Sequence, residues 1–392
     1  MLAGTSFRLA VLRRYGSAKH AATELFYERS GPIDTVLRRR PSHEADFSVA
    51  LSQSAARVEL LAFPLTLYDI AAIERGYRSA GVAGAEGIAR ITDAGPGSAF
   101  QAGDLVLALP GMAGTWRDQA IVPEAKRALV AVPAPLRKAI EDKVPGMLER
   151  AATLLGAPAI AHRLLEDNAL QPGDTIVQND AGSAVGLALV QLAGIRGIKT
   201  VSIVENEMLD DDEPIRGNED PYAVVAERIK ALGGDVVVSS SFAQQTAAFR
   251  ELVSELAGPR GMPRFAFNGA GGASANQMLH CLQASGTMVT YSGRRATHPI
   301  VVSTSAFVER ELTLKGFNLI HWLEGAPRER IQSMVDALSQ AMVKGMLTGW
   351  LERKSFATLE TADIATARHG SRARQLVAIT KAGESYVQSA AS

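Results

Sequence analysis

Cysteine is nearly absent from this chain of 392 residues, because Cys281 is the only one. A disulfide framework and a thiolate-rich zinc site are therefore excluded. The seven histidines show no HxH or HxxxH spacing, so we predict no metal site. A single cysteine also fits a reducing compartment.

Charge of one sign and long apolar runs are missing as well. Lysine plus arginine and aspartate plus glutamate number 41 each, so no bulk charge indicates nucleic acid or a membrane surface. No apolar run approaches the roughly 20 residues that a membrane helix needs, and we expect no membrane span. The apolar fraction of 47% and the length are typical of a globular protein with two domains.

Acidic residues are also missing from the N-terminus, where Glu24 is the first. Arginine-bearing, acid-poor segments are typical of mitochondrial transit peptides, so we predict one over residues 1–20 and a location in the mitochondrial matrix. A disordered basic terminus is the alternative, because Phe7 and Arg14 share a helical face and the amphipathicity is imperfect.

The rest of the chain shows two main sequence patterns. Residues 21–155 contain short β-type runs broken by Gly and Pro, such as TELFYE, GIARITDAG and DQAIVP, which predict a small barrel or sandwich. In residues 156–345, apolar strands such as DTIVQN, KTVSIV and GTMVTYSG alternate with helical segments. This alternation predicts an α/β fold with a doubly wound parallel sheet. Residues 346–392 are mixed and are expected to pack back on the first domain.

The turn DAGSAVG follows the first strand of the predicted parallel sheet. Small side chains there let the backbone approach a pyrophosphate, and the next helix begins with free N–H groups. The full GxGxxG spacing is absent, and a tightly packed turn without a ligand is the alternative. The candidate cofactor-binding residues of this turn are Gly182, Ser183, Ala184, Val185 and Gly186.

The end of the next predicted strand reads IVENE, with Glu205, Asn206 and Glu207. A carboxylate at this point can accept hydrogen bonds from both ribose hydroxyls of NADH, but it repels the 2′-phosphate of NADPH. Acidic residues continue to Asp220, and such a run is typical of a solvated loop.

Several local strings carry a resemblance to a known family. They are LYDIAAIERGY, GAEGIARI, GTWRDQAIVP, LQPGDTIVQND, GTMVTYSG and LTLKGFNLIHW. With them, the chain resembles the mitochondrial trans-2-enoyl-CoA (enoyl-thioester) reductases, a zinc-free branch of the medium-chain dehydrogenase/reductase superfamily. The resemblance implies a GroES-like catalytic domain and a Rossmann domain. It also implies a homodimer that reduces enoyl-CoA or enoyl-acyl-carrier-protein with NADPH in mitochondrial fatty-acid synthesis.

By this resemblance, Tyr77 is the catalytic proton donor. Hydride addition to the β carbon leaves an enolate-like thioester whose α carbon must be protonated. A phenol, with an unperturbed pKa of about 10, keeps its proton at neutral pH and can give it to a carbanion. A tyrosine whose hydroxyl only meets water is the alternative.

The resemblance also implies further contacts. Residues expected to touch the cofactor are Tyr291, Ser292, Gly293, Arg294, Phe317, Asn318, Leu319 and Arg374, the last at a family lysine. Trp116 and Trp322 are expected to line an acyl-chain channel, with core positions as an equal alternative. Two departures are Asn318, where the family has tryptophan, and Pro158, where it has asparagine. NADPH is the expected cofactor, and NADH is the alternative because Glu205 and Glu207 replace basic residues.

Two other functions remain open at this point. One is a zinc-free quinone or alkenal reductase of the same superfamily, and the other is a catalytically inactive nucleotide-binding homologue. The GTWR and LKGF strings favour the enoyl-thioester reductase.

Overall fold

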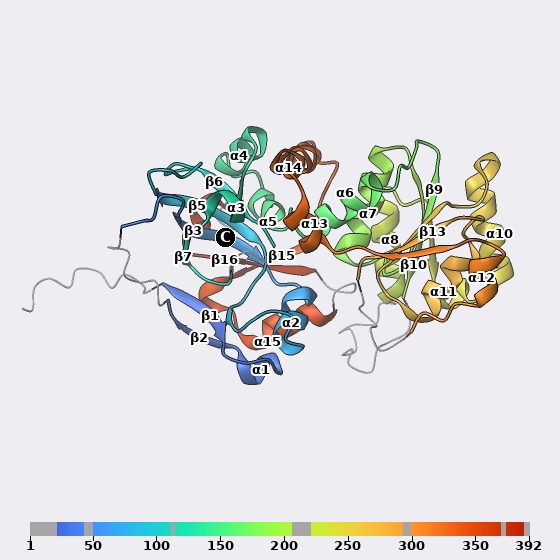
Figure 1. Ribbon diagram of the computed structural model, residues 1–392, viewed down its shortest axis with the longest axis horizontal. Coiled ribbons are helices and arrows are strands. Elements are labelled where there is room, and N and C mark those ends of the chain that lie inside the picture. The colour runs from blue at the N-terminus through green and yellow to red at the C-terminus, as the bar shows by residue number, and fades with distance from the viewer. Residues whose placement is uncertain are drawn as a thin grey trace, which may run out of the picture.

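A computed structural model describes residues 22–42, 50–110, 114–205, 221–292, 299–369 and 374–387. Figure 1 shows two lobes side by side, one built from both ends of the chain and the other from its middle. The predicted transit peptide lies outside the described residues. The α/β fold class predicted from the sequence is confirmed.

The catalytic lobe contains a mostly antiparallel sheet. In the described part of the chain its strand order is β15-β16-β3-β5-β6-β8, and β7 also pairs with β3. A second sheet has the order β2-β1-β4. The bounds are β1 Thr23–Tyr27, β2 Arg38–Pro41, β3 Ala56–Pro64, β4 Gly81–Val82, β5 Gly87–Ala94, β6 Leu105–Ala108, β7 Gln119–Val122, β8 Leu129–Ala131, β15 Leu351–Ser355 and β16 Gln375–Ile379.

The Rossmann lobe contains a parallel sheet of order β11-β10-β9-β12-β13-β14. The bounds are β9 Thr175–Gln178, β10 Lys199–Val204, β11 Val236–Ser239, β12 Phe265–Asn268, β13 Thr287–Thr290 and β14 Thr313–Gly316. The central strands β9, β10 and β12 are almost entirely buried, because helices cover both faces of a parallel sheet. This is the alternation that the sequence predicts.

The helices of the catalytic lobe and of the junction between the lobes are α1 Ile33–Val36, α2 Leu67–Glu74, α3 Ala125–Ala128, α4 Ala134–Glu141, α5 Met147–Ala152, α6 Ala157–Glu166, α14 Arg328–Val343 and α15 Thr361–Ala365. Those of the Rossmann lobe are α7 Ala184–Ile195, α8 Pro221–Ala231, α9 Ser240–Ala243, α10 Thr246–Ala257, α11 Gly272–His280, α12 Thr304–Val308 and α13 Leu319–Gly325. The segment after β11 is divided between two helices, α9 and α10. The Ser239 side chain accepts a hydrogen bond from the Phe242 amide and starts α9 directly after β11.

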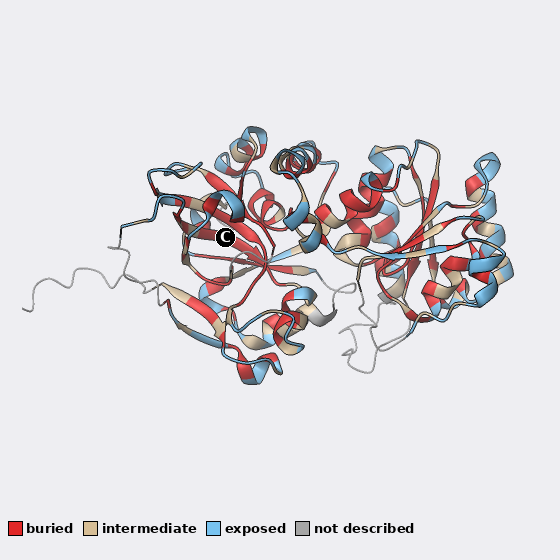
Figure 2. Ribbon diagram, in the orientation of Figure 1, coloured by how far each residue is buried: buried red, intermediate tan, exposed pale blue. Residues whose placement is uncertain are grey.

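One hydrophobic core runs through both lobes. Its buried members include Leu61 and Ile88 of the catalytic sheet, Leu164 of α6, and Phe267 and Val289 of the parallel sheet. Figure 2 shows buried residues filling both sheets and the helices between them. The two lobes are therefore held together by apolar packing, and the surfaces between them have a defined shape.

Candidate active site

The turn between β9 and α7 is closely packed. Ser183 caps α7, and its Oγ accepts a hydrogen bond from the Gly186 amide at 3.1 Å. A Cβ on Gly186 would lie 2.5 Å from the carbonyl oxygen of Ala181, so only glycine fits this close approach of helix and turn. The turn thus has the small side chains that a dinucleotide pyrophosphate requires, and it leads into a helix start whose residues Ser183 to Val185 are half-buried.

Buried amides fix the carboxyl ends of β9 and β12, between which the strand order reverses. Asn179 donates to Asn268 Oδ1 and Ser274 Oγ, both at 2.9 Å, and its Oδ1 accepts from the Gly269 amide at 2.7 Å. Ligands bind in open α/β sheets at such a reversal. Asn179 was not predicted from the sequence, because an asparagine after a strand is also common in loops that bind nothing.

Tyr291 follows β13 and covers the same sheet edge. A Cβ on Gly269 would lie 2.5 Å from the Tyr291 hydroxyl, so the glycine makes room for the phenol. Burial raises the pKa of Tyr291 above its usual range, and the charge of Asp180 adds to this rise. The buried phenol therefore stays protonated beside the turn.

Of the other predicted cofactor-binding residues at this sheet edge, the structure describes some and leaves others out. Glu205 directly follows β10 and is half-buried, and Ser292 is half-buried next to Tyr291. Asn206, Glu207, Gly293 and Arg294 lie outside the described residues.

A narrow cavity of about 40 Å³ lies where the two lobes meet at this turn. Its walls come from α5, α6, the turn and α7, α14, and the C-terminal segment. The lining residues are Arg150, Thr153, Ala157, Pro158, Gly182, Ala184, Leu187, Ala188, Met342, Leu347, Thr348, Gly349, Trp350, Leu351 and Gln375. Arg374, at the family lysine, is exposed and precedes Gln375. The turn and the C-terminal segment, far apart in sequence, are therefore neighbours, and we call this cavity the dinucleotide cleft.

A larger cavity of about 570 Å³ lies beside β14 and contains other candidates. It is lined by Arg163, Leu164, Asp167, Asn168, Val289, Thr290, Lys315, Gly316, Phe317, Asn318, His321 and Trp322. Asn318 caps α13, and its Oδ1 accepts hydrogen bonds from the amides of Ile320 (2.9 Å) and His321 (3.2 Å). Leu319 is buried in the core beside this cavity.

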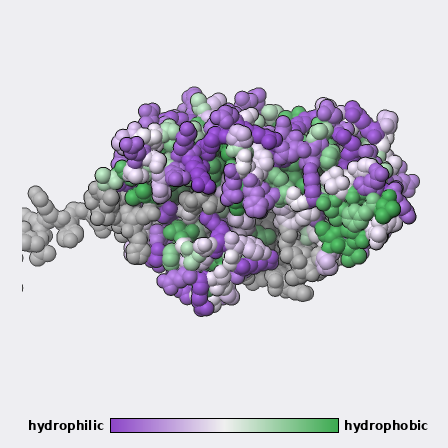
Figure 3. All heavy atoms as spheres, viewed as in Figure 1, coloured by the Kyte–Doolittle hydropathy of each residue, from purple (hydrophilic) through white to green (hydrophobic). Residues whose placement is uncertain are grey.

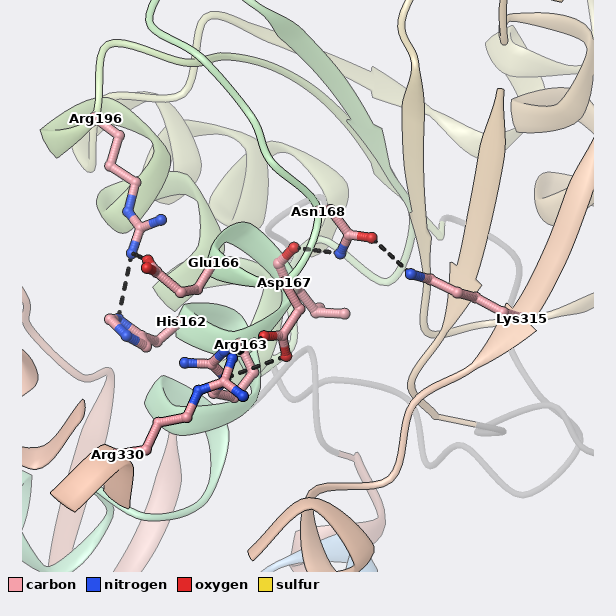
Figure 4. A network of polar contacts seen from close by, with 9 residues as sticks. His162, Arg163, Glu166, Asp167, Asn168, Arg196, Lys315 and Arg330 are labelled. Atoms are coloured by element: carbon pink, nitrogen blue, oxygen red, sulfur yellow. Dashed lines mark hydrogen bonds and ion pairs between the residues drawn. The ribbon is translucent and has the colours of Figure 1, made fainter. Parts of the chain in front are cut away.

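Charged groups surround this cavity, as Figure 4 shows. Arg163 forms an ion pair with Asp167, and Arg330 bonds the same carboxylate at 2.9 Å. The guanidinium carbons of Arg163 and Arg330 lie 4.6 and 5.6 Å from the ring centre of Trp322. Burial, with Arg196 and Arg163 nearby, lowers the pKa of His162 to about 4. Arg163 and Arg330 share the single carboxylate of Asp167, and Lys315 donates to the neutral amide of Asn168, so the cavity wall keeps a net positive charge.

Tyr77 lies in the turn that follows α2. Thr66 and Asp69 form a capping box that starts α2, and Arg75 ends the helix. Gly76 has a φ of +70°, the left-handed conformation that turns the chain sharply. Tyr77 is 60% exposed, and Arg75 Nη1 donates to its hydroxyl at 3.3 Å. The phenol is accessible, and it lines neither of the two cavities above.

Trp116 does not line a channel, which corrects its expected role. Its side chain is 0% exposed in a core cluster with Phe63, and its indole N–H donates to the Pro64 carbonyl at 3.2 Å. The backbone on both sides of the indole is bonded to neighbouring segments, to Leu25 and Ala83. This pairing directs the indole into the core, so the alternative of a core position holds for Trp116.

Two buried carboxyl groups were not anticipated from the sequence. Asp69 is 2% exposed and Glu86 is 5% exposed. Burial raises the pKa of Asp69 to about 6, and burial together with Asp69 raises the pKa of Glu86 well above its usual range. The feature of the sequence that could have identified Glu86 is an acidic residue between small residues, in GAEGIARI, next to an apolar strand.

Metal and membrane features were searched over the same residues. Within the described ranges, no three or more His, Cys, Asp or Glu side chains cluster as metal ligands would. None of the helices that the structure describes combines the length and apolar character needed to cross a bilayer.

Comparison with known proteins adds independent information. No protein-family model matches the chain. The chain is 30% identical over 371 residues to the mitochondrial enoyl-[acyl-carrier-protein] reductase of Dictyostelium discoideum, covering 92% of this chain and 95% of that protein. It is 31% identical to the human enzyme of the same name over 308 residues, covering 76% of this chain and 74% of that one.

Solved structures share the fold. The mitochondrial 2-enoyl thioester reductase Etr1p/Etr2p heterodimer from Candida tropicalis has a TM-score of 0.75 at 21% identity, over 91% of this chain and 99% of that one. Etr1p has also been solved with NADP and crotonyl-CoA (TM-score 0.74, 21% identity, 91% and 99% covered). A putative NADPH:quinone reductase from Bacillus thuringiensis is similar at a TM-score of 0.71 and 17% identity, over 91% and 98%. On its identity to the Dictyostelium and human enzymes, the chain belongs to the mitochondrial enoyl-[acyl-carrier-protein] reductase family.

Proposed function

We propose that this protein reduces the double bond of trans-2-enoyl thioesters, enoyl-CoA or enoyl-acyl-carrier-protein, in mitochondrial fatty-acid synthesis. The observation that carries the proposal is the dinucleotide cleft at the reversal of the parallel sheet, in a chain of this family. Gly182, Ser183 and Gly186 supply the close backbone approach that a bound dinucleotide needs.

Some residues of the chain bind the cofactor, and Tyr77 protonates the substrate. A nicotinamide dinucleotide, when bound, supplies the hydride that goes to the β carbon of the enoyl group. The Tyr77 hydroxyl gives its proton to the α carbon, forming the second C–H bond, and the phenolate regains a proton from water. The 60% exposure of Tyr77 leaves the phenol open to substrate and to this water.

We take NADPH as the first cofactor and NADH as the alternative. Family membership and the NADP of the Etr1p complex support NADPH. Glu205, at the end of β10 where the adenosine ribose lies in Rossmann folds, opposes a 2′-phosphate. Direct titration of both dinucleotides decides between them.

For the assembly we propose a homodimer. The strand β14 pairs only with β13 in the described residues, and Thr313, Lys315 and Gly316 are exposed along its other edge. Val301, Phe307 and Val308, which precede this strand, are exposed. Figure 3 shows a hydrophobic patch on the surface of the Rossmann lobe. An open strand edge beside an apolar patch favours pairing with another chain. Sedimentation equilibrium tests this, and a monomer at micromolar concentration would contradict it.

One experiment separates the candidate functions. Protein of residues 22–392 is assayed with crotonyl-CoA and with a quinone, each with NADPH and with NADH. We expect turnover of crotonyl-CoA that exceeds turnover of the quinone. The opposite preference would indicate a quinone reductase. The similar fold of the Bacillus thuringiensis protein is the reason to test this alternative. Dinucleotide binding without turnover of either substrate would indicate an inactive homologue.

A further inference from the structure

A buried carboxyl group lies directly behind the wall of the dinucleotide cleft. Glu86 precedes β5 in the catalytic lobe, is 5% exposed, and its Oε2 makes no hydrogen bond. Its backbone carbonyl accepts a hydrogen bond from Thr115 Oγ1 at 2.8 Å, which anchors this point of the chain. A buried polar atom without a partner is costly, so its retention requires an explanation.

The carboxyl group is packed against the start of α6. A Cβ on Gly156 would lie 2.1 Å from Glu86 Oε1 and 2.8 Å from Oε2, so the side chain rests on bare glycine backbone. The Gly156 amide donates to the Thr153 carbonyl at 3.3 Å and also lies close enough to the Glu86 carboxyl group to favour its charged form. Glu86 therefore joins the catalytic lobe to the first turn of α6.

The residues that follow Gly156 form part of the dinucleotide cleft. Ala157 and Pro158 line it together with Gly182 and Ala184 of the turn between β9 and α7, which we call the glycine turn. A displacement of the start of α6 therefore changes the shape of the cleft beside this turn.

We propose that Glu86 is a positioning residue for dinucleotide binding, which holds the start of α6 at the distance from the glycine turn that the cofactor needs. The inference rests on the proposed function. Burial and the neighbouring Asp69 raise the pKa of this carboxyl group well above its usual range. Glutamine has the same shape and no charge, so it is expected to replace Glu86 in this contact with the start of α6.

The test is the affinity for NADPH, measured by calorimetry on the protein of residues 22–392. Glu86→Ala is expected to raise the NADPH Kd about tenfold, and Glu86→Gln is expected to restore it to within about twofold. The KM for NADPH should rise in E86A while kcat at saturating NADPH changes by less than about threefold, because a cofactor bound in the same pose reacts alike. The control is Glu24→Ala. Glu24 is another buried glutamate, which lies on β1, forms an ion pair with Arg40 of β2 and does not line the cleft. The substitution should lower the urea midpoint but leave the NADPH Kd unchanged.

A second variant approaches the same contact from the other side. In Gly156→Ala the new methyl group displaces the Glu86 carboxyl, so the NADPH Kd should rise, and combining it with Glu86→Ala should relieve part of that effect. An unchanged Kd in folded G156A and E86A, or a loss in E86Q as large as in E86A, would overturn the positioning role. A wild-type protein that binds neither NADPH nor NADH would instead overturn the proposed function.

Discussion

Arg75 and Tyr77 are joined by a hydrogen bond from Nη1 to the phenol oxygen, 3.3 Å long, across Gly76 with its left-handed φ. The turn therefore presents the phenol outward with a cation beside it. Because the phenol oxygen accepts this hydrogen bond, its own proton remains available for donation. The arrangement fits a proton donor.

Tyr77→Phe removes this acid and keeps the ring. Turnover of crotonyl-CoA should fall by roughly 10²-fold or more, the scale of a lost general acid, while NADPH binding and the thermal midpoint stay near wild type. Tyr68→Phe is the control, because Tyr68 is 40% exposed on α2 of the same lobe and has no assigned role. Near-normal turnover in Y77F would remove Tyr77 from the mechanism.

Gly186→Ala tests the close packing of the turn. The new Cβ would lie 2.5–2.7 Å from backbone atoms of Ala181, which cannot move as a flexible side chain would. We expect a loss of about 1–3 kcal/mol in unfolding free energy and at least a tenfold weaker NADPH affinity. Gly194→Ala in the same helix is the matched control. Its Cβ meets nothing within 4 Å, so stability should rise by up to about 1 kcal/mol. Equal effects of the two substitutions would refute the packing argument.

Glu205→Arg tests cofactor choice. A carboxylate about 4 Å from a phosphate charge costs about 1 kcal/mol in water and about 4 at an effective dielectric of 20. Replacing it with a cation should therefore raise the ratio of NADPH to NADH affinity by at least about tenfold. Both dinucleotides are titrated against wild type and variant. If the ratio does not improve, Glu205 does not face the ribose.

Asp69 predicts a pH-dependent stability. Its pKa rises from 3.8 to about 6 in the folded state, so the folded protein binds more protons than the unfolded chain between these values. The stability contributed by this group is then present below pH 3.8 and is lost as pH rises through 6. The unfolding free energy of Asp69→Asn minus that of the wild type should rise by up to about 3 kcal/mol from pH 4 to pH 7, as measured by urea unfolding. Asparagine keeps an oxygen for Thr66, and a pH-independent difference would contradict the assignment.

The N-terminal segment makes a prediction in cells. Residues 1–20 fused to a fluorescent reporter should direct it to mitochondria, because the segment is basic and free of acidic residues. A version with its three arginines replaced by glutamine should remain in the cytosol. A cytosolic wild-type fusion, with no processed form on a gel, would count against a transit peptide.

The sequence predicted the parallel sheet and the glycine turn because both depend on local patterns. Apolar strands that end in Gln178 or Val204 are visible in any short window, as is the run of small residues from Ala181 to Gly186. The prediction that Trp116 lines a channel was wrong. Its burial depends on backbone hydrogen bonds with Leu25 and Ala83, which no local sequence pattern reveals. Glu86 was missed for the same reason, since Gly156, against which it packs, lies far away in the sequence at the start of α6.

The position of β16 has a consequence for how the protein is made. This strand lies between β15 and β3, and its residues Val377–Ile379 pair with Ala62–Pro64. During synthesis β16 emerges after every other strand of the described residues, so the catalytic sheet closes later than the parallel sheet between Thr175 and Gly316. Nascent chains without β16 should therefore carry an incomplete catalytic lobe with an open edge beside β3, and deletion of β16 should leave the Rossmann lobe folded and the enzyme inactive.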